Sequence, residues 1–266
     1  SGSVAFTESV PVNYDRYLGP MLFEPYANDI VNRVDLREGM RVLEVACGTG
    51  IVTRKLRQLL PQSATIVATD LSEHMLDFAR RKLSGTAGVE WQQADAMTLR
   101  FADESFDLVV CQFGLMFMPD QLAALREMRR VLAPGGELLL NTWDKLEHND
   151  FSHTVHVTQM RFFPADPPMF YETPYSLHDV EQLRSWLQLA GYTQISVRPV
   201  NLPVMSASAA DAAKGLVQGT PLIVAINERG GDVAAITGAV AEALAHDFGK
   251  KPTRGRMSAI VCHATR

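Results

Sequence analysis

Cysteine is scarce in this sequence, and long apolar runs are missing. The three cysteines, Cys47, Cys111 and Cys262, are far apart, and each lies in an apolar stretch typical of a strand. This spacing counts against disulfides and favours buried thiols in a reducing cytosol. No apolar run approaches the ~20 residues that a bilayer-spanning helix needs, and no secretory signal pattern is visible. We therefore expect a cytoplasmic protein without a membrane span.

The sequence also lacks an excess of basic residues. It has 25 lysines and arginines against 30 aspartates and glutamates, and they form no basic stripe. Because nucleic-acid phosphates are bound through such stripes, we expect no nucleic-acid partner. The 266 residues, of which 47% are hydrophobic, are enough to bury a large core.

What the sequence does have is a glycine turn between a strand and a helix. Residues 41–46 form a short apolar run, Gly48, Thr49 and Gly50 interrupt it, and a helical pattern follows up to Pro61. Glycine allows a positive φ and lets a ligand approach where a Cβ would stand. The free N–H groups of the first helical turn then face any ligand beyond the strand.

An acidic residue follows the next predicted strand. Residues 64–69 are apolar and β-branched, and Asp70 comes directly after them, twenty residues beyond Gly50. A carboxylate in this place can accept both hydroxyls of a ribose. This pattern fits a nicotinamide dinucleotide or S-adenosylmethionine. Thr53 stands where the dinucleotide fingerprint has glycine or alanine, which counts against the dinucleotide.

Further candidate residues follow the later strands. Ser72 is expected to cap the helix after Asp70, so that Met75 can lie against an adenine ring or belong to the core. Asp95 follows a third predicted strand, residues 89–93, and can accept from an adenine amino group or simply cap a turn. Gln112 follows a fourth strand over 106–111.

Strands and helices alternate regularly as far as Trp143. A turn at Pro134, Gly135 and Gly136 is expected to lead into a fifth strand over 137–142. The alternation predicts an α/β fold with a parallel sheet and right-handed crossovers, whose ligands bind beyond the carboxyl ends of the strands. The candidate residues all fall at these ends.

Five segments together resemble the class I S-adenosylmethionine-dependent methyltransferases, most closely the small-molecule branch that includes quinone-biosynthesis enzymes. The resemblance covers about residues 14–144. The segments are Leu-Glu-Val-Ala-Cys-Gly-Thr-Gly, Ala-Thr-Asp-Leu-Ser-Glu-His-Met-Leu, Gln-Ala-Asp-Ala, Asp-Glu-Ser-Phe-Asp-Leu-Val-Val and Arg-Val-Leu-Ala-Pro-Gly-Gly-Glu-Leu.

The resemblance implies a Rossmann-like parallel sheet, an antiparallel C-terminal strand pair and S-adenosyl-L-methionine as cofactor. The glycine turn would hold the methionine moiety, Asp70 the ribose, Met75 and Asp95 the adenine, and Phe113 would lie near the sulfonium. The full implied cofactor set is Ala46, Cys47, Gly48, Thr49, Gly50, Asp70, Leu71, Met75, Asp95, Ala96, Gln112 and Phe113.

The remaining segments are expected to form a helical cap. Residues 1–36 predict an N-terminal helical cover, with a helix over 28–34. The methyltransferase domain then spans 37–266, with cap insertions at 145–177 and 201–256. The alternative for these apolar insertions is plain packing or a contact between two copies in a homodimer. Elsewhere we expect helices over 178–191, 207–217 and 232–248 and strands over 193–200 and 257–264.

Aromatic side chains in the cover and the first insertion are candidate substrate contacts. Tyr14 or Tyr17 either folds over the cofactor mouth or packs against the domain, which is the usual fate of such rings. The candidates are Tyr14, Tyr17, Phe162, Phe170 and Tyr175.

Three histidines after the fifth strand are candidates for a catalytic base. His148, His153 and His156 start close to the expected reaction site, and histidine accepts protons near neutral pH. The alternative is that they are surface histidines without a catalytic role. Alignment of the reactants alone can account for ~7 to 11 kcal/mol of the barrier, so the reaction does not require a base. Their spacing also resembles that of metal ligands on a helix, but the implied family needs no metal and we expect none.

The sequence thus predicts an enzyme that transfers the methyl group of S-adenosylmethionine to an O, N or C atom of a small, partly apolar metabolite by in-line displacement. One alternative is a nicotinamide-dependent oxidoreductase on a Rossmann fold. Another is a non-catalytic cofactor-binding protein of the same fold. A nucleic-acid methyltransferase is disfavoured, because the fourth strand ends in Cys-Gln-Phe-Gly and not in the Pro-Pro-aromatic loop that stacks a flipped base.

Overall fold

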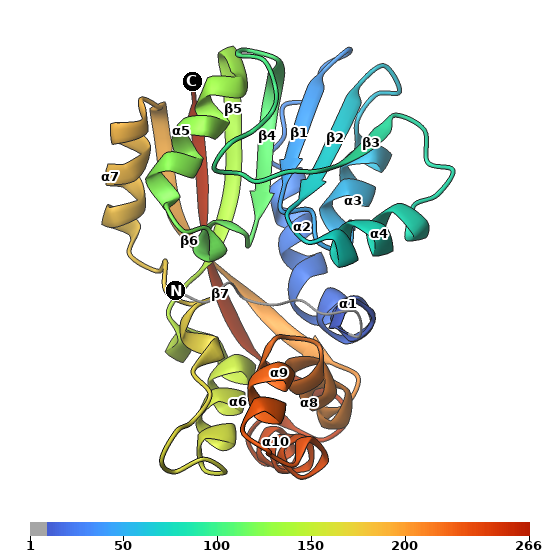
Figure 1. The fold of residues 1–266 in the computed structure, drawn as a ribbon, viewed down its shortest axis with the longest axis vertical. Helices are drawn as coiled ribbons and strands as arrows, with labels where there is room; N and C mark the ends of the chain where they lie inside the picture. The colour runs from blue at the N-terminus through green and yellow to red at the C-terminus, as the bar shows by residue number, and fades with distance from the viewer. Residues whose placement is uncertain (1–9) are drawn as a thin grey trace. The chain divides into compact units, whose positions relative to one another are not determined.

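The computed structural model describes residues 10–266, which fall into two compact units (Figure 1). The sheet unit consists of Tyr26–Thr142, Leu177–Val200 and Ala259–Arg266. The described residues of the helical unit are 10–25, Trp143–Ser176 and Asn201–Ser258. The part of the expected N-terminal cover in residues 1–9 lies outside the described residues. That the insertions cover a ligand site stays a prediction.

The strands form one seven-stranded sheet with the order β3-β2-β1-β4-β5-β7-β6. Strand β1 pairs in parallel with β2 and β4, β2 pairs in parallel with β3, and β4 with β5. The bounds are β1 Arg41–Val45, β2 Thr65–Asp70, β3 Val89–Gln93, β4 Phe106–Gln112, β5 Leu132–Trp143, β6 Thr193–Ser206 and β7 Thr253–Thr265.

The last strand of the chain, β7, runs in the opposite direction to the parallel strands. Strand β7 lies between β5 and β6. The Arg266 N–H, just after β7, donates to the Gly136 carbonyl near the start of β5 at 2.9 Å, and His263 Nε2 bonds Glu137 Oε1 at 2.9 Å. The predicted fold class, a Rossmann-like parallel sheet with an antiparallel C-terminal strand pair, is confirmed.

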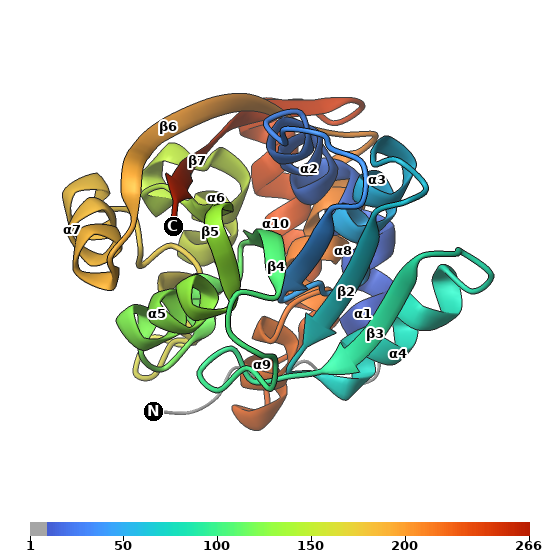
Figure 2. The ribbon, with the colours of Figure 1, turned by 90° about the horizontal axis from the view of Figure 1, so that it is seen from above.

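The helices of the sheet unit lie on both faces of the sheet, with α5 and α7 on one face and α3 on the other (Figure 2). The Ser72 hydroxyl accepts from the Met75 N–H at 3.3 Å, so the predicted cap of α4 is confirmed. The bounds are α2 Glu24–Val31, α3 Ile51–Leu59, α4 Glu73–Lys82, η2 Leu115–Phe117, α5 Gln121–Val131 and α7 Val180–Ala190.

The helical unit gathers α6, α8, α9 and α10 into one group (Figure 1). Helix α6 packs against α10 and α8, and α8 packs against η1. The bounds are α1 Val10–Asn13, η1 Tyr14–Phe23, η3 Leu146–His148, α6 Asp150–Met160, η4 Phe170–Glu172, α8 Ala209–Gln218, α9 Leu222–Glu228 and α10 Val233–Phe248.

Several element bounds differ from those predicted. Helix α2 begins at Glu24, four residues before the predicted start, and follows a π-helical segment that contains Pro20, whose missing N–H interrupts the regular α-helical ladder. The turn predicted at Pro134–Gly136 is a bulge within β5, where residues 132–137 face residues 106–108 of β4. Strand β6 continues to Ser206, and α9 was not predicted.

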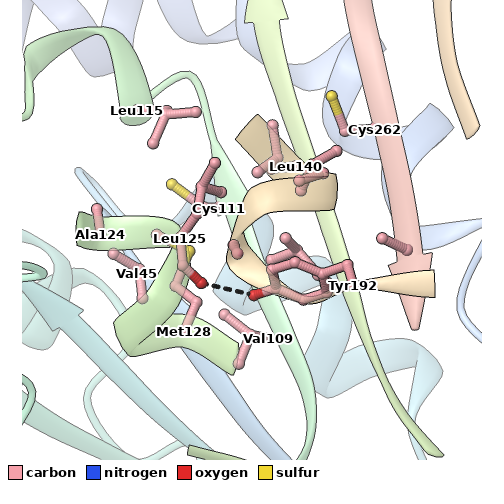
Figure 3. Close-up of a cluster of buried hydrophobic side chains, with 14 of the residues drawn as sticks. Val45, Val109, Cys111, Leu115, Ala124, Leu125, Met128, Leu140, Tyr192 and Cys262 are labelled. Atoms are coloured by element: carbon pink, nitrogen blue, oxygen red, sulfur yellow. Dashed lines mark hydrogen bonds between the residues drawn. The ribbon is translucent and has the colours of Figure 1, made fainter. Parts of the chain in front are cut away.

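Helices α5 and α7 bury their apolar sides on strands β1, β4, β5 and β7 (Figure 3). Cys111 and Cys262 belong to this cluster, and with Cys47 they are free and buried, which confirms that the thiols are unpaired. Burial raises the pKa of Cys111 and of Cys262 to about 12, so both thiols stay neutral. Tyr192 places its hydroxyl in the same cluster and donates to the Leu125 carbonyl at 2.9 Å.

We expect Tyr192→Phe to lower the free energy of unfolding by about 1 kcal/mol, because it removes one buried hydrogen bond and leaves the ring in place. Urea denaturation measures the change. Thr193→Val is the matched control, since the hydroxyl of the neighbouring Thr193 is exposed and its hydrogen bond to the Thr265 carbonyl is long, at 3.4 Å. Equal stability of the two variants would show that the Tyr192 hydrogen bond contributes nothing.

Candidate functional site

The turn after β1 is built from left-handed residues. The φ angles of Ala46, Gly48 and Gly50 are 58°, 55° and 86°. Gly50 is the N-cap of α3, and the Cys47 N–H donates to the Thr69 carbonyl at 2.8 Å, which ties the turn to β2. Glycine adopts this conformation without strain, so the predicted glycine turn is present at the carboxyl end of the strand.

Asp70 holds this turn from the neighbouring strand. Its carboxylate accepts from the Gly48 N–H at 2.9 Å and from the Ser72 N–H at 2.8 Å. Burial raises the pKa of Asp70, and these two amides act against that rise. A carboxylate has lone pairs for about four donors, so Asp70 keeps capacity for hydroxyl donors of a ligand.

Glu44, which sequence reasoning missed, lies buried beneath the turn. It belongs to β1, and its carboxyl group accepts from the Thr53 hydroxyl of α3. Burial raises the pKa of Glu44 to about 8, with the charge of Asp70 adding to the rise and Thr53 opposing it. The signal was present as a charged residue between two apolar residues of β1, Leu43 and Val45. Thr53 stands where the dinucleotide-binding fingerprint has glycine or alanine, and its hydroxyl donates to Glu44 instead.

The raised pKa makes the stability of the unliganded protein depend on pH. In the unfolded chain Glu44 loses its proton near 4.5, whereas in the folded chain it keeps it to about 8. Between these values the folded state binds one more proton, so its stability falls by up to about 1.4 kcal/mol per pH unit as pH rises. We expect Glu44→Gln to remove this fall, as measured by urea denaturation across the window. The same slope in Glu44→Gln and wild type would contradict the assignment, and Glu90→Gln, on an exposed part of β3, is the control.

The end of β4 is held by a buried asparagine. Asn141 of β5 accepts from the Phe113 N–H at 3.0 Å and donates to Gln112 Oε1 at 3.2 Å. Phe113 has a φ of 51°, and a Cβ on Gly114 would meet the Ala46 Cβ at 2.5 Å. The ends of β1 and β4 therefore approach closely in left-handed backbone, where helices leave to opposite faces of the sheet and ligands of such folds bind. Sequence reasoning missed Asn141.

The ends of β2 and β3 carry the remaining predicted cofactor residues. Leu71 is 65% exposed, whereas Met75 and Ala96 are buried. Asp95 is exposed, and its carboxylate accepts from the Met97 N–H at 2.9 Å. This bond is the turn cap, the simpler of the two roles predicted for Asp95, and it leaves the second carboxylate oxygen for another donor.

One buried atom of the turn lacks a partner. The Thr49 side chain is 2% exposed, and its Oγ1 has no hydrogen-bond partner. Buried hydroxyls are nearly always hydrogen-bonded, so this atom fits a polar ligand group over the turn. Together with the glycine backbone and Asp70, it matches the amino-acid and ribose ends of S-adenosylmethionine. The residues present fit that group.

The predicted substrate residues all belong to the helical unit. Tyr14 stacks on Phe23 with ring centroids 4.6 Å apart, and Lys214 Nζ lies 5.5 Å from the centroid of the Tyr17 ring. Phe162 is 43% exposed, and the Phe170 ring meets Tyr171 edge-on at 5.1 Å. Tyr175 is buried and stacks on Trp143 at 5.6 Å. Their role in binding a substrate stays a prediction.

The three predicted histidines have different surroundings in the same unit. His148 Nδ1 lies 3.2 Å from Asp144 Oδ2, and 55% of its side chain is exposed. His153 is half-buried. His156 is buried, its Nδ1 has no hydrogen-bond partner, and burial lowers its pKa.

Asp144, another residue that sequence reasoning missed, is the centre of a hydrogen-bond network. The Ser258 hydroxyl and the Lys145 N–H both donate to it at 2.8 Å. Burial acts to raise the pKa of Asp144, but the bonds from Lys145, Ser258 and His148 outweigh it, and the pKa is lowered. The Asn149 side chain bridges the Lys145 and Ser258 carbonyls at 3.0 and 3.2 Å and fixes this turn. Asp144 therefore stays ionised and holds His148.

Two absences concern residues 10–266. This part of the chain has no group of three or more histidine, cysteine, aspartate or glutamate residues arranged to hold a metal ion. None of its helices is long and apolar enough to cross a bilayer.

Known proteins share this arrangement. A family model described as a methyltransferase domain matches residues 42–136. Over 172 residues the chain is 34% identical to the ubiquinone/menaquinone biosynthesis C-methyltransferase UbiE of Shewanella sp. strain ANA-3. The aligned region covers 60% of this chain and 68% of that protein. The chain belongs to the class I S-adenosylmethionine-dependent methyltransferases. This confirms the predicted family, enzyme class and cofactor over the nicotinamide alternative.

The methyltransferase is also similar to a second sequence relative and to a solved structure. This chain is 37% identical over 132 residues to a demethylmenaquinone methyltransferase of Staphylococcus aureus strain MRSA252. The aligned region covers 48% of this chain and 55% of the relative, so the chain spans about half the length of that relative. A Haemonchus contortus phosphoethanolamine N-methyltransferase 2 in complex with S-adenosylhomocysteine has a TM-score of 0.64 at 18% identity, covering 98% of this chain and 57% of that chain. The second similarity shows the fold alone. The two sequence relatives carry quinone-biosynthesis names, so the predicted branch of the family is confirmed.

Proposed function

We propose that this methyltransferase methylates a ring carbon of a small hydroxylated aromatic compound of the hydroquinone type. The observation that carries methyl transfer is the convergence of the glycine turn, Asp70 and Phe113 at the carboxyl ends of β1, β2 and β4. The acceptor class comes from the two relatives, whose names specify demethylmenaquinone and a C-methyltransferase of ubiquinone and menaquinone biosynthesis.

The proposed cofactor contacts follow the strand ends. The turn at Ala46, Cys47, Gly48, Thr49 and Gly50 holds the methionine moiety, and the Thr49 hydroxyl gains the partner it lacks. Asp70 accepts from the ribose hydroxyls. The adenine lies between Leu71 and Met75, with Asp95 and Ala96 at its edge, and Gln112 and Phe113 lie nearest the sulfonium. When bound, S-adenosylmethionine supplies an electrophilic methyl group on a positively charged sulfur.

We propose His148 as the base that prepares the acceptor. Its Nδ1–H donates to Asp144, which leaves the Nε2 lone pair for a substrate proton. Nε2 takes the proton of a ring hydroxyl, and the electron pair of that O–H bond delocalises onto the ring carbon that forms the new bond to the methyl group. That carbon then loses its own proton to solvent, and the ring oxygen takes its proton back from Nε2, which restores the aromatic ring. Asp144 acts as a positioning residue, since it fixes the tautomer and orientation of His148. His153 and His156 are not needed for this step.

The predicted homodimer is open to direct measurement. We propose that exposed apolar side chains of the first insertion contact a second copy of the chain in a homodimer. The two most exposed of them are Phe162 and Met169, at 43% and 40%. Size-exclusion chromatography with light scattering measures the molecular mass. A mass of one chain, 29.4 kDa, would contradict a dimer.

The acceptor assignment is tested with labelled donor. Full-length protein is incubated with S-adenosylmethionine carrying a ¹³C methyl group and with a panel of hydroquinones, phenols, amines and 2-oxo acids. We expect the label on a ring carbon of a hydroquinone, located by mass spectrometry and NMR. Label only on oxygen or nitrogen, or on no member of the panel, would contradict the proposal.

A further inference from the structure

Polar side chains line one buried side of α6 in the helical unit. Ser152, His156 and Gln159 follow each other by four and three residues, so they share one face of the helix. Their exposed fractions are 2%, 8% and 0%. A helix normally turns apolar residues toward the core, so buried polar residues in a row are unusual. We define these three residues as the α6 polar stripe.

Two atoms of the α6 polar stripe have no hydrogen-bond partner, namely His156 Nδ1 and Gln159 Oε1. The orientation of the Gln159 amide is determined, because its Nε2 donates to the Pro168 carbonyl at 2.8 Å and the reverse orientation would set two oxygens against each other. Gln159 therefore presents an acceptor that needs an O–H or N–H donor. Buried polar atoms normally have a partner, so each of these two atoms has an open place for one hydrogen bond, which a bound water or a ligand can fill.

Aromatic rings adjoin the α6 polar stripe. The Ser152 hydroxyl and the Tyr175 hydroxyl are 2.6 Å apart. The Tyr175 ring stacks on Trp143 with centroids 5.6 Å apart and an interplanar angle of 29°, and lies 6.3 Å from Tyr171. A flat, aromatic ligand can pack against such rings by stacked or edge-on contact.

The charge around the α6 polar stripe favours a neutral ligand. Burial lowers the pKa of His156, with Glu172 and Glu147 opposing the fall and His153 adding to it, so the imidazole is neutral near pH 7. Among residues 10–266, the buried polar and charged side chains include no lysine or arginine. A carboxylate or phosphate would therefore be buried without a cation, which is costly.

We propose that the α6 polar stripe, with Tyr175, is a binding site for a neutral aromatic ring that carries hydroxyl groups. Gln159 Oε1 accepts from one ligand hydroxyl, and His156 Nδ1 forms the second hydrogen bond. The inference rests on the proposed function, since it names the residues that select the hydroquinone-type acceptor. It differs from that function in assigning the selection to α6.

The test compares two ligands and two variants of the full chain by isothermal titration calorimetry under reducing conditions. The probes are naphthohydroquinone and its dimethyl ether, which has the same ring but no hydroxyl donor. We expect wild type to bind the hydroquinone at least about tenfold more tightly than the ether, since only the hydroquinone can donate to Gln159. We expect Gln159→Leu and His156→Leu to lose this preference. Val157→Thr, at an exposed position of the same helix, is the control and keeps it.

Each outcome decides the inference. Equal binding of the two probes by wild type, or an unchanged preference in folded Gln159→Leu and His156→Leu, would overturn it. If the variants fail to fold, the wild-type comparison still decides. Titration of wild type with S-adenosylhomocysteine separates the two proposals. If S-adenosylhomocysteine does not bind, the proposed function is refuted. If it binds but wild type shows no preference for the hydroquinone, only the α6 site is refuted.

Discussion

Asp70→Ala is expected to weaken S-adenosylmethionine binding by about 100-fold or more. The carboxylate accepts from the Gly48 and Ser72 amides and, in our account, from the ribose hydroxyls. Hydrogen bonds to a charged group contribute ~1.5 to 3 kcal/mol each, and two of them at the lower value correspond to a factor of about 100. Isothermal titration calorimetry of the variant and wild type measures the ratio.

Asp107→Asn is the matched control for Asp70. Asp107 lies at the start of β4, where it accepts from the Arg41 N–H at 2.8 Å and from the Arg41 guanidinium at 3.0 Å. This is the amino end of the strands, opposite to the ligand edge of the sheet. We expect Asp107→Asn to leave cofactor affinity unchanged. A similar loss in both variants would mean that Asp70 acts only by stabilising the sheet.

His148→Ala is expected to lower kcat by about 100-fold or more with little change in KM for the acceptor, because general base catalysis contributes 10²–10⁴-fold in rate. Asp144→Asn is expected to lower kcat as well, since an amide can turn either its carbonyl oxygen or its NH2 group toward Nδ1 and so no longer fixes the His148 tautomer. Steady-state kinetics with the labelled-donor assay measures both. Added imidazole should restore part of the activity of His148→Ala and none of that of Asp70→Ala.

His246→Ala tests whether any histidine paired with an aspartate has this effect. His246 Nδ1 lies 2.9 Å from Asp247 on α10, the same kind of pair in an exposed place. We expect this control to keep wild-type turnover. Full activity of His148→Ala would remove the base from the mechanism, and the reaction would then depend on alignment of the reactants alone.

The cofactor half of the fold was predictable because its connections are short and chemically marked. Strand β3, Val89–Gln93, has the predicted bounds, and Ser72 caps the next helix as its hydroxyl and position indicate. Helix α3 ends at Leu59, within one residue of the predicted end before Pro61. Glycine, proline and capping side chains act over a few residues, so their effect can be predicted from the sequence alone.

The buried polar groups were not predictable in the same way. Thr53 was considered only as a missing glycine, because its partner Glu44 lies on another element and only the packing of α3 on β1 brings the two side chains together. Asp144 acquires its role through Ser258, which follows more than a hundred residues later. Helix α6 buries polar residues at helical spacing, which a hydrophobic pattern assigns to the surface.

The most direct measurement of the central claim is calorimetric titration of the full chain with S-adenosylhomocysteine. If the carboxyl ends of β1, β2 and β4 hold the methyl donor, the titration gives saturable heat with one molecule bound per chain. The absence of heat from a sample that still unfolds cooperatively would contradict the account.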